Sequence, residues 1–144
     1  MAHSSSTSDL FYRYKIPPLR LKFEGNRTVL LNMTEISKSL NRDPNLIIRY
    51  FSHKLCTSAR FDPKRDCYVI NGLHLVSSLQ TILLSFSKIF IECKDCGNPE
   101  TILSSKKNMF LKMICKACGQ SNLINSDEKL TKIILQMIKK SFNN

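Results

Sequence analysis

The sequence predicts an α+β fold, in which a small mixed α/β domain is followed by a four-cysteine zinc ribbon and a C-terminal helix. Three observations lead to this prediction. Two C-x2-C pairs, Cys93 with Cys96 and Cys115 with Cys118, are separated by eighteen residues. Short apolar runs of period two come before them, and apolar residues recur every three or four positions from Leu75 to Phe90.

The first part of the predicted α/β domain is a β-hairpin. Residues 19–23 alternate between apolar and charged side chains, which is typical of a half-buried strand. Gly25-Asn26 then turns the chain into residues 28–31, which are mostly apolar.

Two helices are expected after the hairpin. Asn32 or Thr34 can cap a short helix that carries apolar residues as far as Leu40. Asp43-Pro44 supplies a cap and a proline at the first helical position for a second helix, which should run to about Leu55. Its buried face is expected to hold Leu46, Ile47, Tyr50, Phe51 and Leu55.

The most regular periodicity of the chain lies just before the cysteines. Residues 68–70 read as a short strand that ends in the Asn71-Gly72 turn, and the helix that follows should end near residue 91. Between the cysteine pairs, a basic loop over residues 104–108 is expected to precede a ribbon strand over residues 109–113. Ser126-Asp127-Glu128 then predicts the start of an amphipathic helix whose apolar stripe is core rather than docking surface.

These elements give four predicted segments. They are a disordered polar tail over residues 1–10, an α/β domain with an N-terminal arginine-bearing segment over 11–91, a C4 zinc ribbon over 92–125, and a C-terminal amphipathic helix over 126–144.

Four thiolates at this spacing predict one structural Zn²⁺ ion, bound by Cys93, Cys96, Cys115 and Cys118. A glycine follows the second cysteine of each pair, where the turn usually needs a positive φ. Two disulfides are the alternative, but no secretory leader or membrane-spanning stretch is present, so reduced thiols and no membrane partner are expected. The remaining Cys56 and Cys67 are interpreted as surface or core thiols.

The composition points to a polyanionic partner. Twenty-two Lys and Arg residues against eleven Asp and Glu give a formal net charge of +11.

With four glycines the chain has no phosphate-cradling loop, so it is not expected to bind GTP itself. No hydrolase-type nucleophile or carboxylate pair is found, and His53 and His74 are interpreted as structural or surface histidines.

A series of short motifs carries a family resemblance. They are, in order, Phe11–Pro18, Glu24–Asn26, Leu40–Arg42, Arg49–Phe51, Tyr68–Gly72, Cys96–Thr101 and Cys115–Gly119. Together they resemble the N-terminal domain of eukaryotic translation initiation factor 5 over nearly the whole chain after the tail. The homologous beta subunit of initiation factor 2 shares the layout and two of these stretches, whereas the Phe11–Lys15 run and the short segment before it favour factor 5.

The resemblance implies a GTPase-activating protein rather than an enzyme with its own substrate site. Its partners would be GTP-bound initiation factor 2 with initiator tRNA, the rRNA of the small ribosomal subunit, and mRNA and tRNA near the decoding site, in the cytoplasm. Arg13 matches the family's arginine finger, which would act in trans during start-codon recognition. Arg27 and Arg49 fall where the family has lysines and could supply supporting charge.

Other interpretations stay open at this point. Arg13 could be a solvated arginine or could grip an rRNA phosphate, and Arg27 and Arg49 could belong to a solvated basic face. The chain could be beta-subunit-like, or a passive module that binds the small subunit or RNA without activating a GTPase. A zinc-ribbon protein of transcription fits less well, because of the motifs before the ribbon. The family's C-terminal helical-repeat domain is expected to be absent, since the sequence ends at Asn144.

Overall fold

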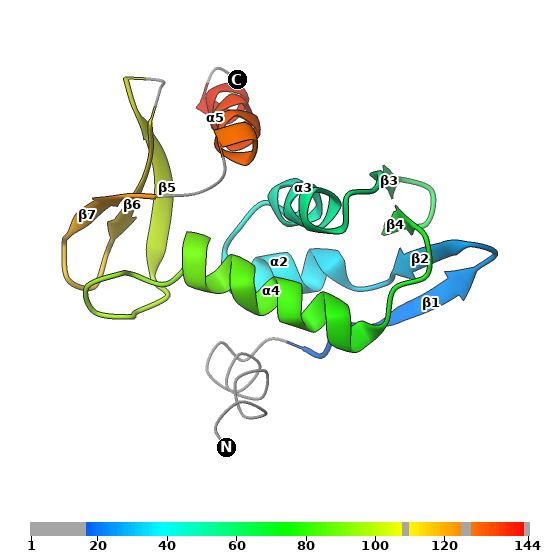
Figure 1. Cartoon of the computed structure of the whole chain (residues 1–144). Coiled ribbons are helices and arrows are strands. Elements are labelled where there is room, and N and C mark those ends of the chain that lie inside the picture. Colours follow the sequence, from blue (N-terminus) through cyan, green and yellow to red (C-terminus); the bar gives the residue numbers. More distant parts are fainter. Residues whose placement is uncertain (1–16, 108–109, 125–127, 143–144) are drawn as a thin grey trace. The chain divides into compact units, whose positions relative to one another are not determined.

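The computed structural model describes residues 17–107, 110–124 and 128–142. They form two compact units, one ending at Ser85 and the other beginning at Phe86. The predicted α+β class is confirmed by the mixed helices and sheets and the C-terminal helix (Figure 1). Four cysteines cluster as predicted. Within the described residues, no helix has both the length and the apolar character needed to cross a membrane.

The first unit contains a four-stranded antiparallel sheet. Its strands are β1 (Leu21–Glu24), β2 (Arg27–Leu30), β3 (Ala59–Asp62) and β4 (Cys67–Asn71), in the order β1-β2-β4-β3. The predicted hairpin is present as β1 and β2, and Gly25 at its turn has a φ of 59°. β3 is an edge strand that the sequence did not predict, because its residues do not show the alternation of apolar and polar side chains that is typical of a strand. It is defined instead by its pairing with β4.

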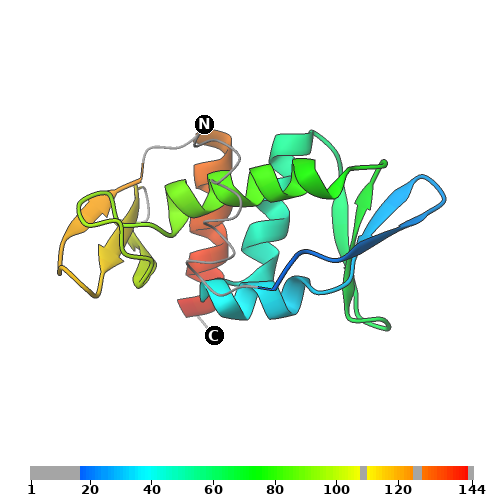
Figure 2. The same cartoon turned by 90° about the horizontal axis from the view of Figure 1, so that it is seen from below.

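Two helices pack on one side of this sheet, as Figures 1 and 2 show: α2 (Met33–Leu40) and α3 (Pro44–Leu55). Asp43 caps α3 as predicted, because its carboxylate accepts a hydrogen bond from the backbone N–H of Asn45 at 2.9 Å. The predicted capping of α2 by a side-chain hydrogen bond is not observed. Asn32 occupies the N-cap position, but its side chain bonds backbone groups of Pro18 and Arg20 instead.

The core of the first unit lies between the helices and the inner face of the sheet. Leu30, Tyr68 and Ile70 point to that face, and Tyr50 and Phe51 of α3 have no exposed surface. The Tyr50 hydroxyl lies 2.7 Å from the Ser85 hydroxyl, which satisfies the buried end of the ring. The remaining large side chains that are fully buried here are Met33, Ile36, Ile47, Leu79 and Leu83.

The outer face of the same sheet also carries a buried apolar group. The strand register places Val29 opposite Val69, and Asp62 opposite Cys67, on the face away from Leu30. Val29, Cys67 and Val69 are at most 4% exposed and form a cluster of their own.

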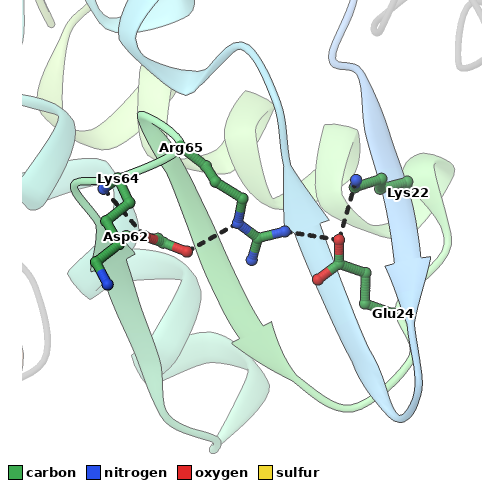
Figure 3. Close-up of polar contacts among 5 residues, drawn as sticks. All are labelled: Lys22, Glu24, Asp62, Lys64 and Arg65. Carbon is green, nitrogen blue, oxygen red and sulfur yellow. Dashed lines mark hydrogen bonds and ion pairs between the residues drawn. The ribbon is translucent and has the colours of Figure 1, made fainter.

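An arginine bridge spans this outer face (Figure 3). Arg65, in the turn between β3 and β4, bonds the Asp62 carboxylate through Nε at 2.9 Å and the Glu24 carboxylate through Nη1 at 2.7 Å. Lys22 makes a further ion pair with Glu24 at 3.0 Å. The bridge therefore links the edge strands β1 and β3 across the two strands between them.

A hydrogen-bonded turn leads from β4 into α4 (Val76–Phe90), the helix with the predicted periodicity. The buried Thr28 hydroxyl donates to the Gly72 carbonyl at 2.8 Å and accepts from the backbone N–H of His74 at 2.9 Å. Gly72 has a φ of 92°, and a Cβ there would lie 3.0 Å from the His74 ring, so the turn favours glycine twice over.

The second unit contains a three-stranded antiparallel ribbon and a helix. The strands are β5 (Thr101–Lys106), β6 (Phe110–Cys115) and β7 (Ser121–Leu123), in that order across the sheet, and the helix is α5 (Glu128–Phe142). The prediction of a basic loop over residues 104–108 is wrong in part, because Ser104–Lys106 pairs with β6 as strand. Inter-strand hydrogen bonds hold this polar segment extended despite its loop-like composition.

One face of the ribbon forms the core of the second unit. Leu111, Met113 and Cys115 are buried on this face, and α5, which contacts β5 and β6, buries Leu130 and Ile134. The predicted apolar stripe of α5 is thus partly core, since Ile133, Met137 and Ile138 remain half-buried. The serine and aspartate of the predicted cap, Ser126 and Asp127, lie outside the described residues.

Candidate metal centre

The four predicted cysteines converge on one point. The sulfur atoms of Cys93, Cys96, Cys115 and Cys118 all lie within 4.8 Å of one another. Cys93 follows α4, Cys115 ends β6, and each is paired with a cysteine three positions later on an exposed turn. The first cysteine of each pair is buried and the second is exposed, so the site lies at the edge of the ribbon.

The two cysteine turns are built alike. In the first, the N–H of Gly97 donates to the Cys93 carbonyl at 2.9 Å, and the Cys93 N–H donates to the Asn98 carbonyl at 3.0 Å. In the second, the N–H of Gly119 donates to the Cys115 carbonyl at 2.9 Å, and the Cys115 N–H donates to the Gln120 carbonyl at 2.9 Å. Equivalent backbone hydrogen bonds therefore orient the sulfur atoms of both cysteine pairs.

A glycine closes each turn for a conformational reason. Gly97 has a φ of 75° and Gly119 a φ of 79°, in a region that L side chains rarely adopt. A Cβ built on Gly119 would meet no atom within 4 Å, so space does not exclude a side chain there. Backbone conformation alone favours glycine at Gly119.

The spacing of the sulfurs fits a tetrahedral metal site. Cys93 Sγ lies 3.7 Å from Cys118 Sγ, and Cys96 Sγ lies 3.6 Å from Cys115 Sγ. A tetrahedron with metal–sulfur bonds of about 2.3 Å has sulfur–sulfur edges of about 3.8 Å, whereas a disulfide needs about 2.05 Å. The four residues could hold one metal ion, and none of them forms a disulfide in the structure.

The electrostatics of the four thiols favour a bound cation. The backbone N–H of Cys118 donates to the Cys115 sulfur at 3.4 Å, and this bond is the main cause that lowers the pKa of Cys115 to about 7. Although the backbone at Gln120 acts to lower it, desolvation and the neighbouring sulfurs raise the pKa of Cys118 to about 12. Such close thiols resist losing all their protons together unless a metal takes up the charge.

Contacts outside the cysteines tie the first turn to β7. The Asn122 amide donates to the Asp95 carboxylate at 2.9 Å, and Lys94 Nζ donates to the Leu123 carbonyl at 3.1 Å. Sequence reasoning missed these residues. Asn122 and Asp95 are 27 positions apart, and no local pattern indicates which residues the ribbon brings together.

Of the three predicted arginines, the structure describes Arg27 and Arg49. Arg13 lies outside the described residues. Arg27 begins β2 and is exposed, with Glu24 and Asn71 as its register partners, and Arg49 is exposed on α3. No interaction in residues 17–107 joins Arg27 to Arg49.

The remaining thiols and histidines have local partners. Cys67 belongs to the outer apolar cluster, and Cys56 is exposed at the C-terminal end of α3. His74 Nε2 lies 2.8 Å from the Asn71 carbonyl, within the turn before α4. Among the described residues, the group of potential metal ligands consists of the four cysteines and includes neither histidine.

Comparison with known proteins finds a family match and several relatives. Residues 4–121 match the family model described as the domain found in initiation factors 2B and 5. The chain is 41% identical over 136 residues to a mouse protein named eukaryotic translation initiation factor 5, and 44% identical over 135 residues to the protein of that name from Caenorhabditis elegans. A protein named probable eukaryotic translation initiation factor 5 from Schizosaccharomyces pombe is 38% identical over 133 residues.

The matches cover most of this chain but little of the relatives. They span 91% of the chain for the mouse and nematode proteins and 89% for the yeast protein. They span only 31% to 34% of the relatives, so the chain corresponds to about a third of their length.

Proposed function

Because this chain belongs to the family of the domain found in initiation factors 2B and 5, we propose that it is a translation initiation factor that activates the GTPase of initiation factor 2 on the small ribosomal subunit. The observation that carries the proposal is the identity of 41% to 44% to factor 5 relatives along nearly the entire chain. The family match includes Arg13 and all four cysteines. It does not separate factor 5 from the beta subunit of factor 2, because both have this kind of domain.

Arg13 is proposed as an arginine finger that acts in trans. Its guanidinium stays charged at all physiological pH values and can donate several hydrogen bonds to a phosphate. Placed in the nucleotide site of a partner, it would stabilise the charge that develops on the transferred phosphoryl group, an effect of roughly 10³- to 10⁵-fold for arginine fingers generally. The chain itself would hold no nucleotide, so its role is that of an activator rather than an enzyme.

Arg27 and Arg49 are proposed as supporting charges. Both side chains are exposed, which is what contact with a partner requires. Arg27 begins the strand that follows the β1–β2 turn, so its backbone is fixed by the sheet.

A structural Zn²⁺ ion is proposed for the four-cysteine site. Four thiolates in a closed set are the ligands that zinc takes in structural sites, and they leave no position for a water or substrate. The ion would hold both cysteine turns and would take no part in GTP hydrolysis.

The test is single-turnover GTP hydrolysis by the complex of initiation factor 2, GTP and initiator tRNA on small subunits with a start codon. The chain and its Arg13→Ala, Arg13→Lys, Arg27→Ala and Arg49→Ala forms would be compared. Arg20→Ala is the matched control, since Arg20 is an exposed arginine near the same end of the chain. We expect stimulation that Arg13→Ala and Arg13→Lys abolish, that Arg27→Ala and Arg49→Ala reduce, and that Arg20→Ala leaves intact.

Binding to small subunits is measured in parallel. If the chain binds them tightly but neither it nor any variant alters hydrolysis, the activator proposal fails, and a passive ribosome-binding or beta-subunit-like role replaces it. If Arg13→Ala stimulates as well as the unchanged chain, activation does not use an arginine finger.

A further inference from the structure

The ribbon presents a second sheet face that faces away from its core. Pairing places Ile102 opposite Ile114, Lys106 opposite Phe110, and Lys112 opposite Leu123. Directly opposed residues of antiparallel strands share a face, and this face alternates with the one that holds Leu111 and Met113. The outer ribbon face thus consists of Ile102, Ser104, Lys106, Phe110, Lys112, Ile114, Ser121 and Leu123.

Large apolar side chains on this face are open to solvent. Phe110 is 48% exposed, Leu123 50% and Ile102 37%. The helix α5 contacts β5 and β6, and its buried residues lie with those of the opposite face. Because α5 packs on the opposite face within the second unit, an aromatic and two aliphatic side chains of the outer ribbon face stay open to solvent.

The charge on the outer ribbon face has a single sign. Lys106 and Lys112 lie on either side of Phe110, one directly across the ribbon and one two positions along β6. Neither makes an ion pair with a carboxylate in the described residues, and the face itself contains no Asp or Glu. Lys94 Nζ, at 3.1 Å from the Leu123 carbonyl, adds a third cation at the β7 edge.

We propose that the outer ribbon face binds single-stranded RNA, with a base stacked on Phe110 and phosphates contacted by Lys106 and Lys112. Proteins that hold single strands combine an exposed aromatic side chain with nearby cations. Two same-face neighbours in a strand are about 7 Å apart, and opposed residues about 5 Å, so both ammonium groups reach the surroundings of one stacked base.

The same features disfavour the other occupants. A duplex keeps its bases inside and would leave Phe110 without a stacking partner. A second copy of this chain would set lysines against lysines across a two-fold interface. The inference rests on the proposed ribosomal role only for the source of the RNA, because the chemistry of the face is independent of Arg13.

The test uses fluorescence anisotropy with a labelled oligouridylate of about 12 nucleotides and the metal-loaded full chain, at several salt concentrations. Phe110→Ala is compared with Phe23→Ala, because Phe23 is a strand phenylalanine that is 50% exposed in the other unit. Lys112→Ala is compared with Lys38→Ala, in which an exposed lysine of α2 is removed. Metal content and circular dichroism show that each variant is folded.

The salt dependence of binding should distinguish base stacking from phosphate contacts. We expect Phe110→Ala to weaken binding by about 5- to 100-fold with an unchanged salt slope, because it removes a stacked base. Lys112→Ala should weaken binding and reduce the slope of log K against log salt by about 0.7, the value for one phosphate contact of a single strand. The two control variants should bind as the unchanged chain does.

Three results would overturn the inference. They are equal affinities of Phe110→Ala and Phe23→Ala, duplex RNA bound as tightly as the single strand, and a concentration-dependent dimer that only Phe110→Ala disrupts. GTPase stimulation is measured separately at saturating chain. Loss of stimulation with unchanged oligonucleotide binding in Arg13→Ala would support the activator proposal independently of RNA binding. Loss of oligonucleotide binding with unchanged stimulation in Phe110→Ala would support the RNA proposal independently of activation.

Discussion

The conformation of Gly119 gives the sharpest test of the metal centre. Gly119 has a φ of 79°, and a Cβ added to it would meet no atom within 4 Å, so Gly119→Ala would add strain but no clash. An L residue in the left-handed region costs roughly 1–2 kcal/mol. If the cysteine turn adopts its shape only when metal binds, the whole cost appears in the metal affinity, which should fall by about 5- to 30-fold.

The assay is competition for Zn²⁺ with a chromophoric chelator. Gly25→Ala is the matched control, because Gly25 has a φ of 59° and equally open surroundings but lies in the first unit. It should lower the free energy of unfolding of that unit and leave the metal affinity unchanged. An unchanged affinity in Gly119→Ala would refute the reasoning, since the turn would then keep its shape without the ion.

Three further predictions concern the rest of the chain. Cys93→Ser should lose the metal and hydrogen-exchange protection in the second unit while the first stays protected; joint loss would contradict two separate units. Thr28→Val should lower the free energy of unfolding by about 1–3 kcal/mol in urea titrations, because it removes two hydrogen bonds, whereas Thr28→Ser keeps them. Hydrogen bonds from Arg65 lower the pKa values of Glu24 and Asp62, so their stabilisation is present above the ordinary carboxyl pKa and lost as pH falls through the folded pKa. Arg65→Met should raise both pKa values in NMR titrations and flatten the acid limb of stability; unshifted values would refute the bridge.

Local signals predicted much of the fold. The hairpin turn at Gly25, the cap at Asp43 and the periodicity of α4 depend on residues a few positions apart, and all three appear in the structure. β3 could not be predicted in this way, because Phe61 is 41% exposed and the strand is defined by its pairing with β4. Asn32 shows the same limit: its position as a cap is local, but its side chain bonds a segment more than ten positions earlier.

In the candidate site, too, features set by neighbouring residues could be predicted, whereas contacts between residues far apart in the sequence could not. Each C-x2-C turn is local, so the four sulfurs could be predicted to meet once the two turns were placed in one ribbon. The arginine bridge could not, because Arg65 and Glu24 are 41 positions apart and only the sheet brings them together. Arg13, the residue that matters most for the proposed function, lies outside the described residues and stays a prediction.

The cysteine turns also fix which residues occupy the outer ribbon face. Cys115 ends β6, and its N–H bonds the Gln120 carbonyl, which closes the turn into β7. The next residue, Lys116, bonds the Glu100 carbonyl through its backbone and so fixes the start of β5 against the end of β6. A slip of one residue in either pairing would turn Phe110 into the core and Leu111 outward. A metal ion bound by the four cysteines would therefore set the register at the end of a very short sheet. RNA binding by the outer ribbon face should then depend on the metal, whereas the proposed activation through Arg13 should not.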